Sequence, residues 1–215
     1  MGDFLDGIRR PGRRLPLPRA MLYSALIFAA GIGMGILSKV LDLTPSNELP
    51  AFLEALDLRN FFSRIGVWIF LSVSISVYSR SPLRAALHVF GFLAGMVGSY
   101  YLYTVLVAGF YPKSYMMIWI GMTMLSPILA VVCWYAKGRG FIAVLISSIV
   151  FMVMFRQAFS IGFWYWDITY PLELLLLLAT VIILYQSPKQ IMLVIALGVL
   201  LALLIWRIDW LWGLL

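Results

Sequence analysis

The chain is poor in the residues that build metal and redox sites. Its 215 residues include one cysteine, Cys133, and one histidine, His88. A lone cysteine excludes an internal disulfide and any site of several thiolates, and a lone histidine excludes a motif with two histidine ligands. We therefore expect no bound metal and no other cofactor.

Charge is also scarce. Only 12% of the residues are charged, whereas 63% are hydrophobic. This leaves too little polar surface to cover a soluble globule of this size. Nearly all the charge lies in short connectors between long apolar runs, so we expect the chain to lie in a lipid bilayer.

Seven apolar runs are each about as long as a helix that crosses roughly 30 Å of hydrocarbon. They are rich in Leu, Ala, Met and Gly and lack the two-residue alternation of membrane strands. The sequence therefore predicts an all-α fold, a polytopic integral membrane bundle of about seven transmembrane helices. The expected spans are 20–41, 64–78, 83–110, 115–135, 141–163, 171–186 and 190–206.

Several helix ends can be predicted from local residues. Proline favours the first position of a helix, which predicts helix starts at Pro82, Pro171 and Pro188. Ser81 and Ser187 precede two of these prolines and offer capping hydroxyls. Pro127 falls inside the fourth span and is expected to kink it.

Basic residues in the connectors indicate the orientation. If the N-terminus is cytoplasmic, the inner side holds ten of the sixteen Lys and Arg, opposed there only by Asp3 and Asp6. This predicts a multi-pass protein of the cell membrane with a cytoplasmic N-terminus and an extracytoplasmic C-terminus. We attribute the basic segment 9–19 to attraction toward anionic lipid and expect no nucleic-acid partner, because no soluble basic patch is interleaved with aromatics.

The predicted organisation is a basic cytoplasmic arm at 1–19, one transmembrane domain at 20–206 and an aromatic extracytoplasmic tail at 207–215. The longest connector, 43–63, lies on the outer side. Phe52, Leu53 and Leu56 recur in it at helical spacing, which predicts an interfacial helix after Pro50. Such a helix either links two spans or covers an outward-facing cavity.

Polar residues near the outer ends of the spans are the main candidates for function, because charge in hydrocarbon is expensive. Arg156 lies on the order of 10 Å below the expected end of its span, and Glu173 lies at a comparable depth. We expect these two residues to form an ion pair. Alternatively, Arg156 snorkels to the interface and Glu173 is a favourable carboxylate in a first helical turn.

Aromatic residues crowd the same outer side, which holds seven of the eight tryptophans. An interfacial belt explains much of this, but the asymmetry favours an aromatic-lined outer cavity. One cation and one or two carboxylates there would suit a small organic solute with apolar and charged parts. The predicted substrate-binding residues are Arg64, Arg156, Gln157, Trp164, Trp166, Asp167 and Glu173.

The sequence contains few combinations of residues that could act in catalysis. We expect no serine to pair with His88 at matching depth, no aspartate lies in the core of a predicted span, and no glycine-rich phosphate loop occurs. We expect no catalytic residues and no enzymatic activity; an enzyme could use only the group of Arg156, Asp167 and Glu173.

Two functions remain from these observations. The leading expectation is a small membrane transport or solute-binding protein that uses the outer cavity. The alternative is a non-catalytic accessory subunit that docks to a partner membrane subunit through a face of small residues. Such faces also serve internal packing, and they comprise Gly91, Gly95 and Gly98 in the third span and Ala25, Ala29 and Gly33 in the first.

Overall fold

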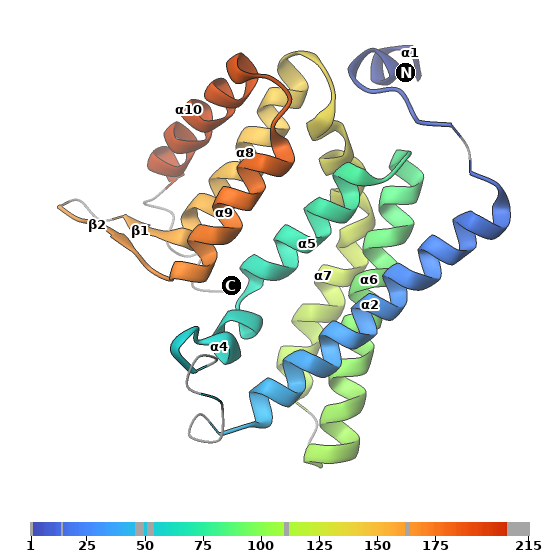
Figure 1. Ribbon diagram of the computed structural model, residues 1–215, viewed down its shortest axis with the longest axis vertical. Coiled ribbons are helices and arrows are strands. Elements are labelled where there is room, and N and C mark those ends of the chain that lie inside the picture. The colour runs from blue at the N-terminus through green and yellow to red at the C-terminus, as the bar shows by residue number, and fades with distance from the viewer. Residues whose placement is uncertain are drawn as a thin grey trace.

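A computed structural model describes residues 2–13, 15–45, 50, 54–109, 112–161 and 164–205, and these are almost entirely helical (Figure 1). In chain order the elements are α1 (Gly2–Ile8), α2 (Leu17–Leu43), α4 (Leu58–Ser63), α5 (Ile65–Tyr78), α6 (Pro82–Tyr103), the π-helix η2 (Thr104–Ala108), α7 (Lys113–Trp134), the 3-10 helix η3 (Tyr135–Lys137), α8 (Gly140–Ala158), β1 (Phe159–Ile161), β2 (Trp166–Ile168), α9 (Pro171–Leu184) and α10 (Pro188–Ile205). The predicted all-α class is confirmed.

Each of the seven predicted spans coincides with a helix, but their lengths differ. Five helices are long and apolar enough to cross a membrane, namely Leu17–Leu43, Pro82–Val107, Lys113–Lys137, Gly140–Ala158 and Pro188–Ile205. The other two, α5 and α9, have 14 residues each. At 1.5 Å per residue they rise only about 21 Å, against roughly 30 Å of hydrocarbon. Within the described residues, length therefore supports five spanning helices.

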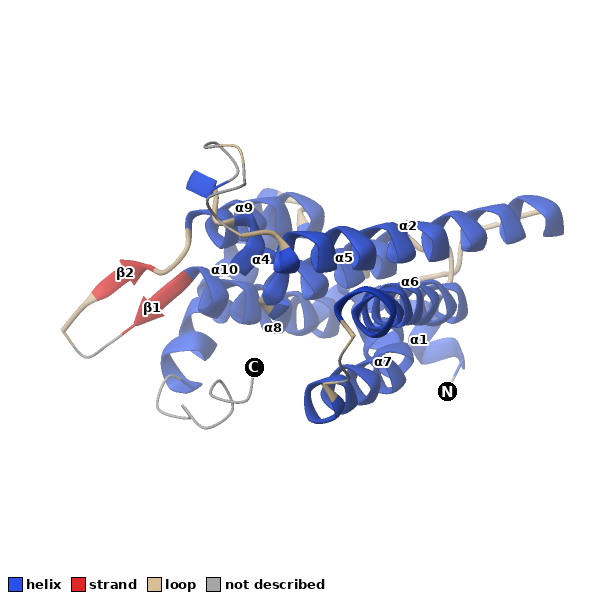
Figure 2. Ribbon diagram, turned by 90° about the horizontal axis from the view of Figure 1, so that it is seen from below, coloured by secondary structure: helices blue, strands red, loops and turns tan. Residues whose placement is uncertain are grey.

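The fifth span is shorter than predicted. Helix α8 ends at Ala158, and the chain turns extended at Phe159. There β1 and β2 form an antiparallel hairpin that pairs Phe159 with Ile168 and Ser160 with Asp167. Aromatic and β-branched residues favour this conformation. The hairpin projects from the bundle (Figures 1 and 2).

The predicted helix starts are confirmed. The hydroxyl of Ser81 accepts a hydrogen bond from the Arg84 amide, and that of Ser187 from the Gln190 amide, both at 3.3 Å. Helix α7 runs through Pro127. Because proline has no amide hydrogen, the Thr123 carbonyl lacks its helical donor and instead accepts the Ser126 hydroxyl at 2.7 Å.

Helix α5 separates two apolar cores. Its residues Val73 and Val77 belong to a core with α8, α9 and α10. Its residues Val67 and Trp68 belong to a second core with α6 and α7. Figure 1 shows α5 between these two groups of helices. Helix α5 thus lies at the centre of the bundle, although its length alone does not suffice to cross a bilayer.

Glycines let α2 and α6 pack backbone to backbone. A Cβ added at Gly31 would lie 2.1 Å from the Phe92 carbonyl oxygen, and one at Gly95 would lie 2.7 Å from the Phe28 carbonyl oxygen. Only glycine permits so close an approach. The other residues of the two predicted small-residue faces do not pack so closely. A Cβ added at Gly33, Gly91 or Gly98 would meet nothing within 4 Å. Ala25 and Ala29 are exposed.

The N-terminal arm docks across one end of the bundle. The guanidinium of Arg9 donates hydrogen bonds to the carbonyls of Val77, at 2.8 Å, and Trp134, and lies over the Trp134 ring. These carbonyls belong to the last turns of α5 and α7, where intrahelical donors are missing and positive charge is favourable. Burial of the guanidinium lowers the pKa of Arg9 from its ordinary value. The arm is therefore part of the folded structure.

Further hydrogen bonds join four connectors at this end. The amide of Gly12 donates to the Arg80 carbonyl at 2.7 Å, and that of Arg139 to the Ile8 carbonyl at 2.7 Å. The side chain of Gln186 donates to the Ala136 carbonyl at 3.2 Å. We call this region the basic end; it comprises the arm, turn 79–81, segment 135–139 and turn 185–187. The other end, where α2 finishes and α4, α5 and α9 begin, is the opposite end.

Candidate functional site

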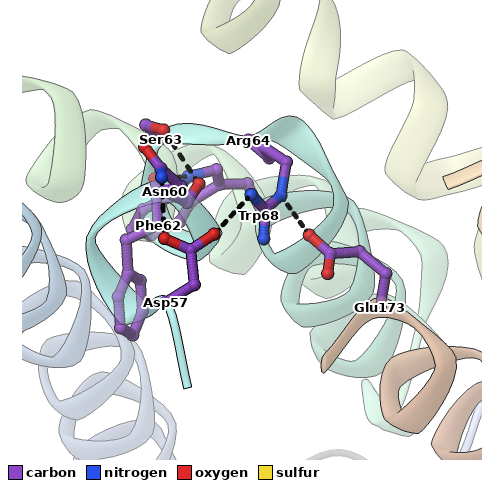
Figure 3. A network of polar contacts seen from close by, with 7 residues as sticks. All are labelled: Asp57, Asn60, Phe62, Ser63, Arg64, Trp68 and Glu173. Atoms are coloured by element: carbon purple, nitrogen blue, oxygen red, sulfur yellow. Dashed lines mark hydrogen bonds and ion pairs between the residues drawn. The ribbon is translucent and has the colours of Figure 1, made fainter. Parts of the chain in front are cut away.

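At the opposite end, Arg64 links three elements. It follows α4 and caps the start of α5, so its side chain leaves the backbone between two helices. Its Nε donates to Oε1 of Glu173 in the first turn of α9, and its Nη1 lies 3.3 Å from Oδ2 of Asp57 (Figure 3). The guanidinium also lies 3.8 Å from the centre of the Tyr170 ring. Arg64 therefore ties the α4–α5 corner to α9.

Glu173 is the most deeply buried acid of this network. Its side chain is 1% exposed, so the ion pair with Arg64 compensates a charge that would otherwise be very unfavourable. Its position in the first turn of α9 adds the favourable end of the helix dipole. Its Oε2 is buried and has no hydrogen-bond partner in the described part of the chain. The carboxylate thus retains accepting capacity.

Asp57 holds the other side of the network. It precedes α4 with φ 50°, the one non-glycine residue with positive φ among those described. Aspartate tolerates this left-handed conformation better than most residues, although at some cost. Its Oδ1 accepts a hydrogen bond of 2.7 Å from Asn60, and the Ser63 hydroxyl donates to the Asn60 carbonyl at 2.8 Å (Figure 3). Both ends of α4 are thus held by polar contacts.

Two predicted site residues, Arg64 and Glu173, meet in this network, and two others lie beside it. Gln157 packs against the start of α5, because a Cβ added at Gly66 would lie 3.6 Å from its Cγ. Arg156 is half-buried in the last turn of α8. We expected Arg156 to be the ion-pair partner of Glu173, and this is wrong: the described ion pair of Glu173 is with Arg64. The cause is the α4–α5 corner, which points the Arg64 side chain toward α9.

The three remaining predicted residues lie on the hairpin and line none of the pockets found among the described residues. Trp164 is 91% exposed, and Asp167 and Trp166 are also exposed. Trp166 does pack one edge against Phe155, with ring centres 5.9 Å apart. Trp164 and Trp166 follow the end of α8, and the hairpin places them beside the bundle rather than in the aromatic-lined cavity in which they were predicted.

An aromatic pocket does exist at the opposite end, between α2, α4, α6 and α7. Its apolar lining includes five aromatic side chains besides Phe62, and its polar lining includes Asp42 and Arg59. We call it the aromatic pocket; it is lined by Ser38, Asp42, Arg59, Phe62, Ser63, Trp68, Met96, Val97, Tyr100, Tyr101, Tyr115 and Trp119. Its volume is about 30 Å³, which is room for about one water molecule.

A partly buried polar group, centred on Asp42, forms one wall of the aromatic pocket. Asp42 accepts hydrogen bonds from Lys39 at 2.8 Å and from the Tyr100 hydroxyl at 3.0 Å. The Lys39 ammonium lies 4.9 Å from the centre of the Tyr100 ring. The hydroxyl of Tyr101, a side chain only 6% exposed, is buried without a hydrogen-bond partner in the described part of the chain. Buried hydroxyls are usually satisfied, so this one can bind a water or a ligand.

Helix α4 covers the aromatic pocket and belongs to the Arg64 network at the same time. Arg59, Phe62 and Ser63 of α4 line the pocket. The indole of Trp68, at the start of α5, donates to the Phe62 carbonyl at 3.0 Å (Figure 3). The helix predicted from Phe52, Leu53 and Leu56 is not tested as a whole, because Phe52 and Leu53 lie outside the described residues and Leu56 lies in a turn. In connector 43–63 the structure places α4 at 58–63. Its placement fits the alternative in which it covers a cavity.

Sequence reasoning missed Lys39, Asp42 and Tyr100 as site residues. The i,i+3 spacing of Lys39 and Asp42 on one helix was a usable signal. An interfacial belt accounts equally well for a tyrosine near the end of a span, and no sequence pattern reveals that α2 crosses α6 where these side chains meet.

A larger apolar cavity lies between α5, α6, α7 and α8. Its volume is about 300 Å³, and apart from Ser72, Thr123, Ser126 and Cys133 its lining is hydrophobic. It offers volume but few groups that could orient a polar solute. Among the described residues, no group of three or more His, Cys, Asp or Glu side chains could hold a metal ion.

Comparison with known proteins adds no assignment. No protein-family model matches the chain, and no curated protein or solved structure does so either.

Proposed function

We propose that the chain is a membrane protein that binds or transports a small organic solute at the aromatic pocket. The observation that carries this proposal is a pocket under the short helix α4 that combines edge-to-face aromatic rings, the Asp42 carboxylate and a Tyr101 hydroxyl without a hydrogen-bond partner in the described part of the chain. This keeps the expected type of site but relocates it from the predicted group around Arg156, Glu173 and the hairpin to the pocket lined by α2, α4, α6 and α7.

Helix α4 is proposed to be the gate. A volume of about 30 Å³ admits no organic solute, so binding requires part of the lining to move. Helix α4 has only six residues and is bounded by the left-handed Asp57 and by Arg64. The ion pair of Arg64 with Glu173 would hold the gate closed, and its release would free the α4–α5 corner.

The lining favours a small cation or zwitterion. Tyrosine and tryptophan faces attract an organic ammonium group, and the apolar part of the solute can pack on the same rings. Lys39 forms an ion pair with Asp42, so the negative charge of Asp42 is already compensated before a solute binds. Arg59 is exposed on α4 and can pair with a carboxylate of a zwitterion.

We further infer that α5 and α9 are also embedded, giving seven transmembrane helices, and that the basic end is cytoplasmic. The position of α5 between two groups of longer helices supports the first point. The gathering of the basic connectors at one end supports the second through the positive-inside rule.

The test is thermal unfolding of the purified protein in mild detergent with a panel of quaternary ammonium, amine, amino-acid and neutral solutes. Mass action stabilises the native state by about 2.7 kcal/mol when a ligand is present at a hundred times its Kd. Ligand stabilisation should be reduced by Tyr101→Phe and kept by Tyr185→Phe, an exposed tyrosine at the basic end. If the two substitutions reduce the stabilisation by a solute equally, that solute binds outside the aromatic pocket.

An accessory role is the second candidate. The face formed by Ala25, Ala29 and Gly33 of α2 is exposed, as a helix awaiting a partner helix requires. Under this proposal, the complex extracted from the native membrane should lose a subunit in Ala29→Leu while the chain itself stays folded. An unchanged assembly mass in that variant would count against it.

A further inference from the structure

A second cavity lies at the basic end, between α2, α5 and α6 and next to the arm. Its volume is about 240 Å³, and it is lined by Leu15, Tyr23, Ile27, Ile75, Tyr78, Ser79, Arg80, Arg84 and His88. This is below the roughly 300–1,000 Å³ of pockets for drug-sized ligands, but it has room for a phosphate group. The cavity shares no lining residue with the aromatic pocket.

The fixed charges that line this cavity are all positive. Arg80 and Arg84 contribute two guanidinium groups, and no carboxylate is among its lining residues. The described ion pairs involve neither arginine. The Nη1 of Arg80 lies 3.4 Å from the Arg13 carbonyl, a long contact that leaves its other donors available. Two guanidiniums without carboxylates favour an anion with several acceptor oxygens.

His88 gives the cavity a fixed polar wall. Its Nδ1 lies 3.3 Å from the Ser79 hydroxyl and its Nε2 lies 3.1 Å from the Ser24 hydroxyl. The expectation that no serine pairs with His88 is therefore wrong, because Ser79 in the turn before α6 and Ser24 near the start of α2 lie at the same end of the bundle as His88. Both serines also contact a carbonyl of the preceding turn, Ser79 that of Ile75 at 2.7 Å and Ser24 that of Ala20 at 3.1 Å. The ring is thus held in one orientation beside the two arginines.

The remaining walls suit a lipid. Ile27 and Ile75 are apolar, and Tyr23 and Tyr78 are exposed at the mouth. Tyrosine favours the headgroup level of a bilayer, and basic pockets between membrane helices commonly bind anionic headgroups. We propose that this cavity binds the phosphate of an anionic phospholipid, with Arg80 and Arg84 on the phosphate oxygens and the acyl chains leaving past Tyr23 and Tyr78.

The test compares lipid and free phosphate on the purified full chain in mild detergent. Mixed micelles containing phosphatidylglycerol should raise Tm by a few degrees over phosphatidylcholine, and inorganic phosphate should not. Arg84→Gln should abolish this difference. Arg139→Gln should retain it, because Arg139 is exposed at the same end but outside the cavity. If both variants lose the difference equally, or if the two lipids act alike on the wild type, the proposal fails.

The single histidine provides a direct readout that does not depend on stability. In protein labelled with ¹⁵N-histidine, phosphatidylglycerol should shift the ring resonances of His88, and phosphatidylcholine should leave them in place. A shift by inorganic phosphate that displaces phosphatidylglycerol would assign the cavity to a soluble phosphate compound and overturn the lipid assignment. An unmoved His88 signal in phosphatidylglycerol would also overturn it.

Discussion

Arg64 and Glu173 form an ion pair across 109 residues of sequence, and through it the corner between α4 and α5 is fastened to the first turn of α9. The side chain of Glu173 is 1% exposed and that of Arg64 is 18% exposed. The pair therefore differs from a surface salt bridge, whose contribution is usually small. Its position beside the cover of the aromatic pocket gives it a structural and a functional consequence.

The first prediction concerns this pair. Arg64→Gln should lower the free energy of unfolding by about 3 kcal/mol, because it leaves a buried carboxylate uncompensated. The double change Arg64→Gln with Glu173→Gln should cost less than the sum of the two single changes. The matched cycle of Arg156→Gln with Glu173→Gln should give a smaller coupling. Equal coupling in both cycles, from reversible unfolding in detergent, would contradict the assignment of Arg64 as the partner.

Both partners were recognisable from the sequence as costly charges near span ends, because that inference needs only depth along a helix. Their pairing was not recognisable, because it depends on the direction in which Arg64 leaves a corner between two helices. Helix positions could be predicted from apolar runs, capping serines and prolines. The hairpin at 159–168 could not, since Phe159 and Ile161 continue the apolar run of α8.

The second prediction concerns the gate. In a Cys133→Ser background, a cysteine at Ser38, a buried residue lining the aromatic pocket, should react slowly with a membrane-impermeant maleimide. Adding Arg64→Gln should accelerate that reaction at least several-fold, because α4 is no longer fastened to α9. The control is Ser147→Cys, at a buried site in α8. Acceleration at both sites would indicate general loosening rather than movement of α4.

The third prediction uses the glycines of the first span as a matched pair. Gly31→Ala should destabilise the protein by several kcal/mol or separate α2 from α6, because its Cβ would lie 2.1 Å from the Phe92 carbonyl oxygen. Gly33→Ala, two residues away and with nothing within 4 Å of its Cβ, should be neutral or stabilising by up to about 1 kcal/mol through helix propensity. Thermal unfolding followed by circular dichroism measures both. Similar effects of the two substitutions would argue against the close packing of α2 on α6.

The fourth prediction concerns the arm. Arg9→Gln removes charged hydrogen bonds to the Val77 and Trp134 carbonyls and should cost about 1.5–3 kcal/mol of docking free energy. Trypsin should then cleave after Arg13 markedly faster than in the wild type. Arg10→Gln, which changes an exposed neighbour, should leave that cleavage rate unchanged. Fast cleavage in the wild type would mean that the arm is not docked.

The fifth prediction decides whether the short helix α9 crosses the membrane. A cysteine is needed at an exposed position of the basic end. Lys189, which follows α9, is exposed, whereas a side chain at Gly138 would lie 2.6 Å from the Ile8 side chain. In a Cys133→Ser background, Lys189→Cys and Asp167→Cys flank α9. With an impermeant maleimide on intact cells, Asp167→Cys should be labelled, and Lys189→Cys should be labelled only after permeabilisation. Local thinning of the bilayer and neighbouring longer helices would accommodate a helix of about 21 Å. Labelling of both positions from one side would instead mean that α9 enters and leaves on the same face, and the protein would have fewer than seven spans.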